Sequence, residues 1–232
     1  MRSSGLAFSI VVNAMIRFEN VNKTYSLSGK RKVVARNINL NIPSGACVGL
    51  LGRNGAGKST LMRMISGTLA PGSGRIHHSG SVSWPVGFAG SFHPELSGAQ
   101  NTRFIARVYG CDTEELVDFV ADFAQLGVHF QLPFRTYSSG MRSRLAFGVS
   151  MGVRFDTYLI DEVTSVGDAA FQTRSRDMLI ERTKTAGAIV VSHGMGMIRQ
   201  LCTSGAVLEN GNLNYFEDVE EAIAVHEANM TR

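Results

Sequence analysis

The segment Gly52–Ser59 carries the one-letter pattern GRNGAGKS, with glycines at its first and sixth positions and a lysine and a serine at its end. Glycines let a backbone curl until successive N–H groups point at phosphate oxygens. A lysine after them reaches the terminal phosphates, and a serine hydroxyl binds Mg²⁺. We therefore expect a nucleoside triphosphate and Mg²⁺ as ligands, with Lys58 on the phosphates and Ser59 on the metal ion.

Two acids, Asp161 and Glu162, follow the short apolar run Thr157–Ile160. A strand there would deliver Asp161 to its carboxyl end, where a carboxylate can bind a water molecule of the magnesium shell. Glu162, one residue further on, can orient or deprotonate the water that attacks a phosphate. On its own such a run is usually a strand ending in a solvated turn. Together with the glycine-rich segment it favours nucleotide hydrolysis.

The elements around Gly52–Ser59 are those that a phosphate-binding loop needs. Ala46–Leu51 is a nearly continuous apolar run, typical of a strand buried on both faces. Ser59–Ser66 continues with helical spacing, so a helix N-terminus adds its positive potential to the loop. Ile16–Tyr25 and Val33–Ile42 alternate apolar and polar residues, as half-buried strands do. We expect the turn between these two strands within Ser26–Lys32.

The rest of the chain alternates between strand and helix patterns. Short strands are expected within Gly74–Trp84, and a mostly helical stretch from Leu96 to Val153, with a helix start at Asp112. Strands return at Thr157–Ile160, Ala188–Val191 and Ala206–Leu208. This order predicts an α/β fold in which a parallel sheet is interrupted by a helical insert.

A second candidate anion site lies in the helical stretch, at Tyr137–Met141 (YSSGM). Small residues open a helix there, and a serine hydroxyl with free N–H groups at a helix N-terminus can bind an anion. Because the chain already has one phosphate loop, this second site suits a phosphate held by another copy of the chain. A helix cap without a ligand is the alternative.

In this order the motifs resemble those of the ABC ATPase family, and the resemblance extends from Met15 to the end of the chain. YSSGM stands where the family has its signature sequence, and the loop ending at Asp168 stands where the family contacts the opposite subunit. His193 occupies the position of the switch histidine, which would bond the γ-phosphate. Tyr25 is placed like the aromatic residue that stacks on adenine, with local packing as its alternative.

The resemblance implies a P-loop ATPase (RecA-like) core with an antiparallel β edge and an inserted helical signature subdomain. Residues 1–14 are expected to be an N-terminal extension and residues 15–232 a single domain, with core 15–88 and 154–232 and helical part 89–153.

The implied ATP contacts are Tyr25, Gly52, Asn54, Gly55, Ala56, Gly57, Lys58, Ser59 and Thr60. The implied catalytic residues are Glu162 and His193, and the metal contacts are Ser59 and, through water, Asp161. Ser138, Ser139 and Gly140 would complete the site of a second copy in a homodimer, with Asp168 in the dimer loop.

One position departs from the family pattern. The family usually has a glutamine directly after the strand at Ser81–Trp84, where it contacts magnesium and the transmembrane partner. This chain has Pro85–Phe88 (PVGF) there instead. Gln100, Glu95 and His93 are close in sequence, but none of them matches the position.

YSSGM, SWPVGFAGSFHPELSG and LIDEVTSVGD together are similar to the ATP-binding subunits that export bacterial surface polysaccharides, the capsular type in particular. Relatives that export O-antigen often carry a further carbohydrate-binding domain, for which a chain ending at Arg232 has no room. The resemblance implies a separate transmembrane permease, periplasmic or outer-membrane export components reached through it, and a place at the cytoplasmic face of the bacterial inner membrane. Phe88, Phe92 and the face Phe104–Tyr109 are candidates for docking the permease, with packing inside the insert as the alternative.

Composition limits the other function classes. No apolar run reaches the roughly 18–20 residues that span a bilayer. A net charge of +4 is modest, and no basic cluster is large enough to indicate a nucleic-acid partner. Three cysteines without metal-ligand spacing fit a reducing compartment. The alternatives are an exporter of O-antigen or teichoic acid, a soluble ABC ATPase without a transport role, and a regulatory binder that closes on ATP without hydrolysis.

Overall fold

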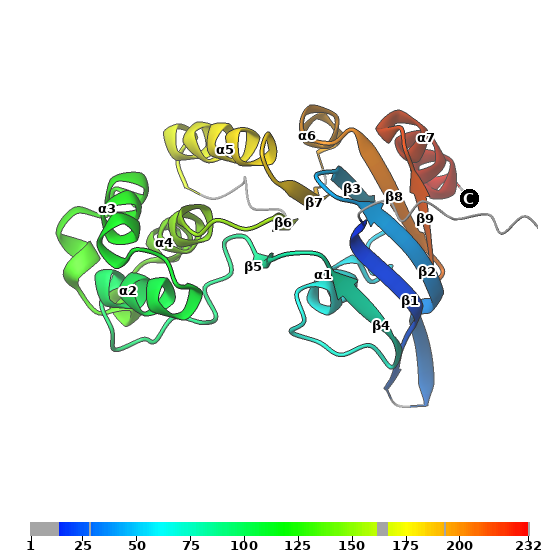
Figure 1. Cartoon of the computed structure of the whole chain (residues 1–232), viewed down its shortest axis with the longest axis horizontal. Coiled ribbons are helices and arrows are strands. Elements are labelled where there is room, and N and C mark those ends of the chain that lie inside the picture. The colour runs from blue at the N-terminus through cyan, green and yellow to red at the C-terminus, as the bar shows by residue number, and fades with distance from the viewer. Residues whose placement is uncertain (1–13, 28, 162–166, 193, 232) are drawn as a thin grey trace, which may run out of the picture.

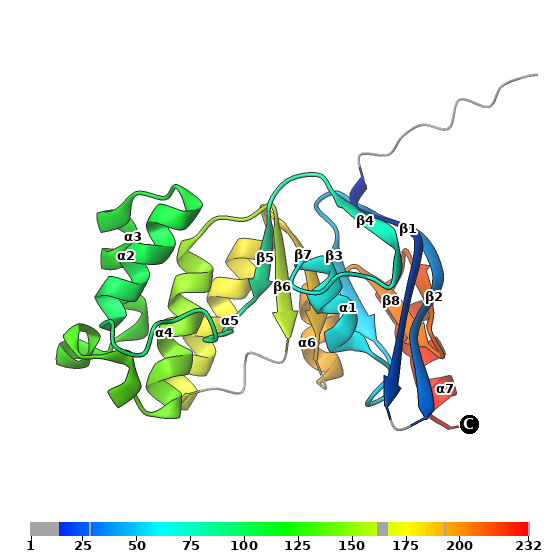
Figure 2. The same cartoon turned by 90° about the horizontal axis from the view of Figure 1, so that it is seen from below.

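The computed structural model describes residues 14–27, 29–161, 167–192 and 194–231. Two sheets and their covering helices form an α/β fold, with a group of helices beside the larger sheet (Figures 1 and 2). The predicted combination of a parallel core and an antiparallel edge is confirmed.

The larger sheet has the strand order β5-β6-β7-β3-β8-β9, and all its neighbouring pairs are parallel except β8 with β9. Its strands are β3 (Cys47–Leu51), β5 (Val82–Pro85), β6 (Thr157–Asp161), β7 (Gly187–Val191), β8 (Ser204–Glu209) and β9 (Asn212–Phe216). β3 and β7 are buried at every residue, which explains why both are apolar throughout.

The antiparallel strand β9 is an element that the apolar runs do not predict. Asn210 and Gly211 join it to β8, and their φ angles of 50° and 84° both lie in the left-handed region. An Asn-Gly pair between two strands is the usual signal of a tight hairpin. The signal is therefore present in the sequence, although two asparagines interrupt the apolar residues of β9.

The smaller sheet is antiparallel, with the order β2-β1-β4. Its strands are β1 (Ala14–Leu27), β2 (Lys30–Pro43) and β4 (Ser73–His78). The turn lies within Ser26–Lys32, as expected, and it is shorter than that range because Ser26 pairs with Arg31 and Leu27 with Lys30. Gly29, with a φ of 76°, supplies the left-handed conformation that so short a turn requires.

Alternate side chains of β3 face two different apolar layers. Val48 and Leu50 lie in one core cluster with α1 (Lys58–Ile65) and the smaller sheet. Cys47 and Leu51 lie in the other, with α5 (Ala169–Thr183), α6 (Met195–Leu201) and α7 (Val219–Met230). At Gly49 a Cβ would lie 2.8 Å from Ile198 Cγ2, so the missing side chain lets α6 approach closely. β3 is thus fixed from both sides.

Three helices follow β5 before the chain returns to the sheet at β6: α2 (Gly98–Tyr109), α3 (Thr113–Ala124) and α4 (Ser139–Gly152), with short 3-10 turns at Gly127–Gln131 and Phe134–Thr136. The expected helix start at Asp112 is confirmed, because its carboxylate accepts a hydrogen bond from the N–H of Glu115 (2.9 Å). Phe123 packs on Phe147 and Phe171 with ring centroids 5.5 Å from each, so α3, α4 and α5 share one aromatic core. The exact division at residues 89 and 153 stays a prediction.

Trp84 connects these helices to the sheet. Its indole N–H donates to Ser150 Oγ in α4 (2.9 Å), and its ring lies 5.0 Å from that of Tyr109 and 5.3 Å from that of Phe155. Phe92 is buried against Phe134, so the alternative of core packing holds for it. Within the part of the chain that the structure describes, no helix combines the length and the apolar character that crossing a bilayer requires.

Candidate functional site

The loop between β3 and α1 runs so close to its neighbours that two of its residues have no room for a side chain. A Cβ on Gly52 would lie 2.5 Å from the carbonyl oxygen of Leu208 in β8. A Cβ on Gly57 would lie 2.3 Å from Val34 Cγ1 in β2, and Gly57 has a φ of 114°. The first and last glycines of the motif are therefore required by packing as well as by backbone conformation.

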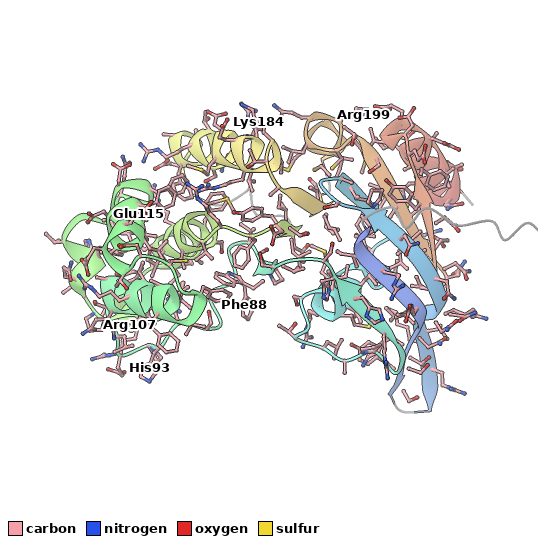
Figure 3. All side chains as sticks on the ribbon, in the orientation of Figure 1. Phe88, His93, Arg107, Glu115, Lys184 and Arg199 are labelled. Atoms are coloured by element: carbon pink, nitrogen blue, oxygen red, sulfur yellow. The ribbon has the colours of Figure 1, made fainter. Side chains whose placement is uncertain are left out.

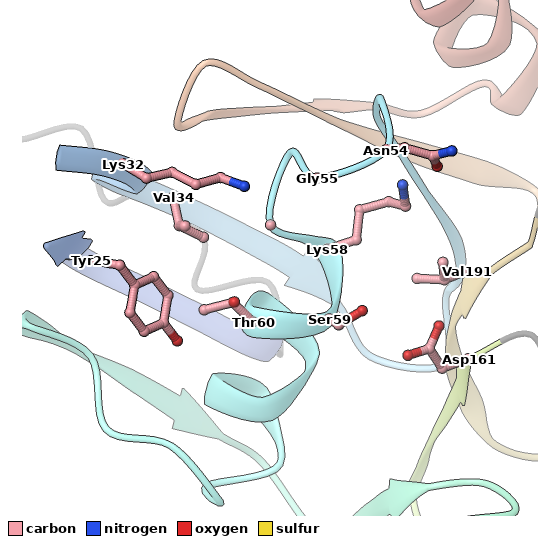
Figure 4. Close-up of a pocket in the computed structure, with 11 residues that line it drawn as sticks. Tyr25, Lys32, Val34, Asn54, Gly55, Lys58, Ser59, Thr60, Asp161 and Val191 are labelled. Carbon is pink, nitrogen blue, oxygen red and sulfur yellow. The ribbon is translucent and has the colours of Figure 1, made fainter. Parts of the chain in front are cut away.

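A cavity of about 300 Å³ opens over this loop (Figure 4). Its lining includes seven of the nine predicted nucleotide contacts, which are Tyr25, Asn54, Gly55, Gly57, Lys58, Ser59 and Thr60, together with Asp161. The other two predicted contacts do not line it. Gly52 packs against β8, and Ala56 packs against the apolar layer that contains α1.

Lys58 lies over the loop that precedes it. Its ammonium donates to the carbonyl oxygens of Gly52 (2.7 Å) and Arg53 (3.3 Å). The charge therefore lies beside backbone that a phosphate group would approach.

Ser59 and Asp161 approach the cavity from facing elements, the start of α1 and the end of β6 (Figure 4). A hydroxyl and a carboxylate are oxygen ligands of the kind that Mg²⁺ prefers, and Mg²⁺ usually takes its other ligands from water and substrate phosphates. Among the described residues there is no cluster of three or more His, Cys, Asp or Glu side chains that could hold a metal ion. The residues present thus fit a magnesium ion that arrives with a nucleotide.

Tyr25 stands opposite Lys32 in the β1–β2 hairpin, and both side chains line the cavity. Tyr25 is 40 % exposed, and the Lys23 ammonium lies 5.6 Å from the centroid of its ring. An exposed aromatic ring on the wall of this cavity offers a surface on which a base can stack.

Three further lining residues were not predicted as site residues: Lys32, Val34 and Val191. Lys32 and Val34 belong to the same face of β2, two residues apart, which is the spacing of a strand. The sequence contains this alternation, but only the hairpin register shows that this face turns toward the loop.

Two predicted catalytic residues, Glu162 and His193, lie outside the described residues, as do residues 165 and 166 of the predicted dimer loop. Asp168, the last residue of that loop, caps α5 by accepting a hydrogen bond from the N–H of Phe171 (2.9 Å), and it pairs with Arg144 of α4. These two interactions, the N–H bond first, lower the pKa of Asp168. The carboxylate is thus held within its own chain.

The YSSGM segment forms the start of α4. Ser138 caps the helix by accepting a hydrogen bond from the N–H of Met141 (3.3 Å), while Ser138 and Ser139 are exposed. Space lies open beside Gly140, where a Cβ would meet no atom within 4 Å. None of these residues lines the cavity over the P-loop of the same chain. Figures 1 and 2 both show β5 and β6 between α4 and α1.

The position of the missing glutamine is occupied by backbone that is part of the sheet. Val86 is buried, and its N–H donates to the carbonyl of Leu159 (2.8 Å). The Gln100 side chain accepts from the N–H of Ser97 in the cap of α2 (2.9 Å), and Glu95 pairs with Arg135 (3.0 Å). Neither side chain lines the nucleotide cavity, so neither replaces the glutamine in this conformation.

The loop follows a buried parallel strand, two of its glycines are sterically required, and Lys58 lies over it, while Asp161 faces it from β6 of the same sheet. These features together define a P-loop nucleotide-binding protein. The model of the ABC transporter family matches residues 35–165, and the chain belongs to that family.

The chain is similar to a polysialic acid transport ATP-binding protein, KpsT, of Escherichia coli, with 45% identity over 90% of this chain and 95% of the relative. It is 43% identical to the capsule polysaccharide export ATP-binding protein CtrD of Neisseria meningitidis, over 90% of this chain and 96% of that one. The fold matches a dimeric ATP-binding cassette solved in a post-hydrolysis state with ADP and Pi. That match has a TM-score of 0.74 at 20% identity, covering 88% of this chain and 99% of the other.

The close approach of Gly57 to β2 leads to a stability prediction. We expect Gly57→Ala to lower the free energy of unfolding by more than Gly67→Ala does. Gly67 also has a positive φ (73°), but a Cβ there would meet nothing within 4 Å. The control should cost about 1 kcal/mol for backbone strain, and Gly57→Ala roughly 1–3 kcal/mol more because Val34 must move. Urea unfolding measures both variants, and equal costs would contradict a steric role of Gly57.

Proposed function

We propose that this chain is the ATP-hydrolysing subunit of an exporter that moves a capsular polysaccharide through a separate transmembrane permease. One observation carries the proposal. A complete P-loop cavity lies in a chain that matches two transport ATP-binding proteins, one for polysialic acid and one for capsule polysaccharide, over nearly the whole length of each. The proposed place of action is the cytoplasmic face of the inner membrane. Periplasmic or outer-membrane export components would be reached through the permease.

The proposed roles of the residues follow from the cavity. The backbone N–H groups of Gly55–Ser59 and the Lys58 ammonium bind the phosphates, and Tyr25 stacks on the adenine ring. Ser59 and, through water, Asp161 would hold Mg²⁺, which would neutralise phosphate charge. Glu162 orients the water that attacks the γ-phosphorus and takes its proton, ADP is the leaving group, and His193 hydrogen-bonds the γ-phosphate.

We further propose that two copies face each other head to tail, so that Ser138–Gly140 of one copy complete the nucleotide site of the other. The exposed start of α4, lying outside its own chain's cavity, supports this arrangement. A serine at a helix N-terminus can bind the γ-phosphate of a nucleotide presented by another molecule. The solved cassette with the same fold is described as a dimer.

The surface proposed to dock the permease lies on α2 and on the segment before it. Phe104 and Val108 of α2 are 54 % and 59 % exposed, and Tyr109 and Phe88 are exposed as well. Figure 3 shows Phe88 projecting from the segment that joins β5 to α2. Several exposed large apolar side chains on one helix and its neighbouring segment are typical of a protein–protein contact.

Hydrolysis is tested with the residue proposed to orient water. Glu162→Gln should bind ATP with near-normal affinity and hydrolyse it at least about 100-fold more slowly, since general-base catalysis contributes roughly 10²–10⁴-fold. The measurements are phosphate release and binding of a fluorescent ATP analogue. Lys58→Ala serves as the contrasting variant, because it should lose binding itself. Turnover near the wild-type rate in Glu162→Gln would remove the proposed role of this residue.

Dimerisation is tested in the same Glu162→Gln background, where bound ATP persists. Adding Ser138→Arg should abolish the ATP-dependent dimer, because a large cation replaces the hydroxyl that would contact the opposite γ-phosphate. Size-exclusion chromatography with light scattering measures the mass with and without ATP. An ATP-dependent dimer of undiminished stability in the double variant would rule out the head-to-tail arrangement.

The transport role is tested by partner binding. A membrane protein should co-purify with the wild-type chain and stimulate its ATPase activity. Phe104→Glu with Val108→Glu should abolish that binding and leave the ATPase activity of the isolated chain unchanged. Val128→Glu with Leu132→Glu is the matched control, since these two apolar residues are 78 % and 43 % exposed and lie outside α2.

Deletion of the gene should trap surface polysaccharide inside the cell. Accumulation of capsular polymer would support the proposal. Accumulation of O-antigen or teichoic acid would show instead that the chain belongs to an exporter of that polymer. If no membrane partner co-purifies and no polymer accumulates, the result would favour a soluble ATPase without a transport role.

A further inference from the structure

A second cavity, of about 460 Å³, lies on the outer side of the P-loop, between the tip of β2 and the β8–β9 turn. Four basic side chains line it: Arg31, Lys32, Arg36 and Arg53. Glu209 is the one acid among its lining residues, so four positive charges face one negative charge. We call these four residues the basic rim.

The charges of the basic rim form no ion pairs with other described residues of the fold. All four side chains are exposed. Arg53 makes one weak contact, from its guanidinium to the carbonyl of Asn229 at 3.4 Å. Four positive charges with a single acid among them repel one another on balance, so the cluster does not serve the stability of the folded chain.

The outer cavity and the nucleotide cavity share part of their walls. Lys32, Asn54 and Gly55 line both of them. The Lys32 ammonium stands over the loop, 3.5 Å from the point where a Cβ of Gly55 would lie, and Figure 4 shows it directed toward Gly55. An anion that moves from the basic rim to the P-loop would therefore pass Lys32.

Clustered charge of one sign beside a binding cleft raises the local concentration of an oppositely charged ligand, and it speeds association more than it strengthens the final complex. We propose that the basic rim is a capture site, which the triphosphate of a nucleotide meets before it enters the P-loop cavity. The inference rests on the proposed ATP function and adds the route and rate of nucleotide entry. Arg31 and Arg36 act before the nucleotide is bound and do not touch it afterwards.

The test is stopped-flow binding of a fluorescent ATP analogue to the full chain. Arg31→Gln with Arg36→Gln removes two charges of the basic rim and leaves Lys32 and Arg53 in place, because those two lie beside or within the P-loop. Arg107→Gln with Arg176→Gln is the control. It removes the same charge from exposed positions on α2 and α5 that line neither cavity.

In about 0.01 M salt, where charges act over roughly 30 Å, the association rate constant of the rim variant should fall by about three- to tenfold. Its dissociation rate constant should stay within twofold of wild type, and the control should keep the wild-type association rate. Near 1 M salt, where screening shortens the range to about 3 Å, the rim variant and wild type should associate equally fast. Reversing the charges with Arg31→Glu and Arg36→Glu should slow association further.

Association that is equally fast in the rim variant and wild type at low salt would overturn the capture site. Faster dissociation with unchanged association would also overturn it, because Arg31 and Arg36 would then contact the bound nucleotide. If wild type binds no analogue at all, the proposed ATP function fails together with the inference. If the rim variant binds the analogue with wild-type rate constants, the capture site is ruled out and the proposed ATP function stands.

Discussion

The structure depends on one steric constraint, the near contact of the P-loop backbone with the strands on either side of it. Gly52 lies against β8 and Gly57 against β2, at distances that leave no space for a methyl group. β8 belongs to the parallel sheet and β2 to the antiparallel one. The loop therefore fills the seam between the two sheets, and both sheets must be in place before its N–H groups can converge on a ligand. Glycine at these positions serves the assembly of the fold as much as the binding of phosphate.

The same constraint explains why the nucleotide cavity has walls of such different origin. Tyr25 and Lys32 come from the antiparallel hairpin, and Lys58 and Ser59 from the loop and its helix. Asp161 comes from the end of a parallel strand two places away from β3 in the sheet. Because the carboxyl ends of parallel strands lie at one edge of a sheet, an acid on β6 reaches the loop that follows β3. The helices α2–α4 contribute nothing to this cavity, and this leaves the start of α4 available to a second copy.

Much of this could be predicted from the sequence, for identifiable physical reasons. The buried strand before Gly52, the helix after it and the acid after Ile160 are local patterns, and each is present in the structure. The cap at Asp112 is equally local. Lys32, by contrast, could not be assigned to the cavity, because its position depends on the register of the β1–β2 hairpin, which the alternating pattern does not determine. The burial of Phe92 depends on contacts with Phe134, forty-two residues away, and the apolar spacing alone does not distinguish a core residue from a docking residue.

Trp84 is the only tryptophan of the chain. Its indole N–H is hydrogen-bonded to Ser150 of α4, and its ring packs on Tyr109, the last residue of α2. Its backbone belongs to the sheet that carries Asp161. Any rotation of the helices relative to the sheet must change the surroundings of that one ring. The protein thus contains an intrinsic fluorescent reporter at the junction between the sheet that carries Asp161 and the helices α2–α4, and ultraviolet emission can follow the movement between them without a label.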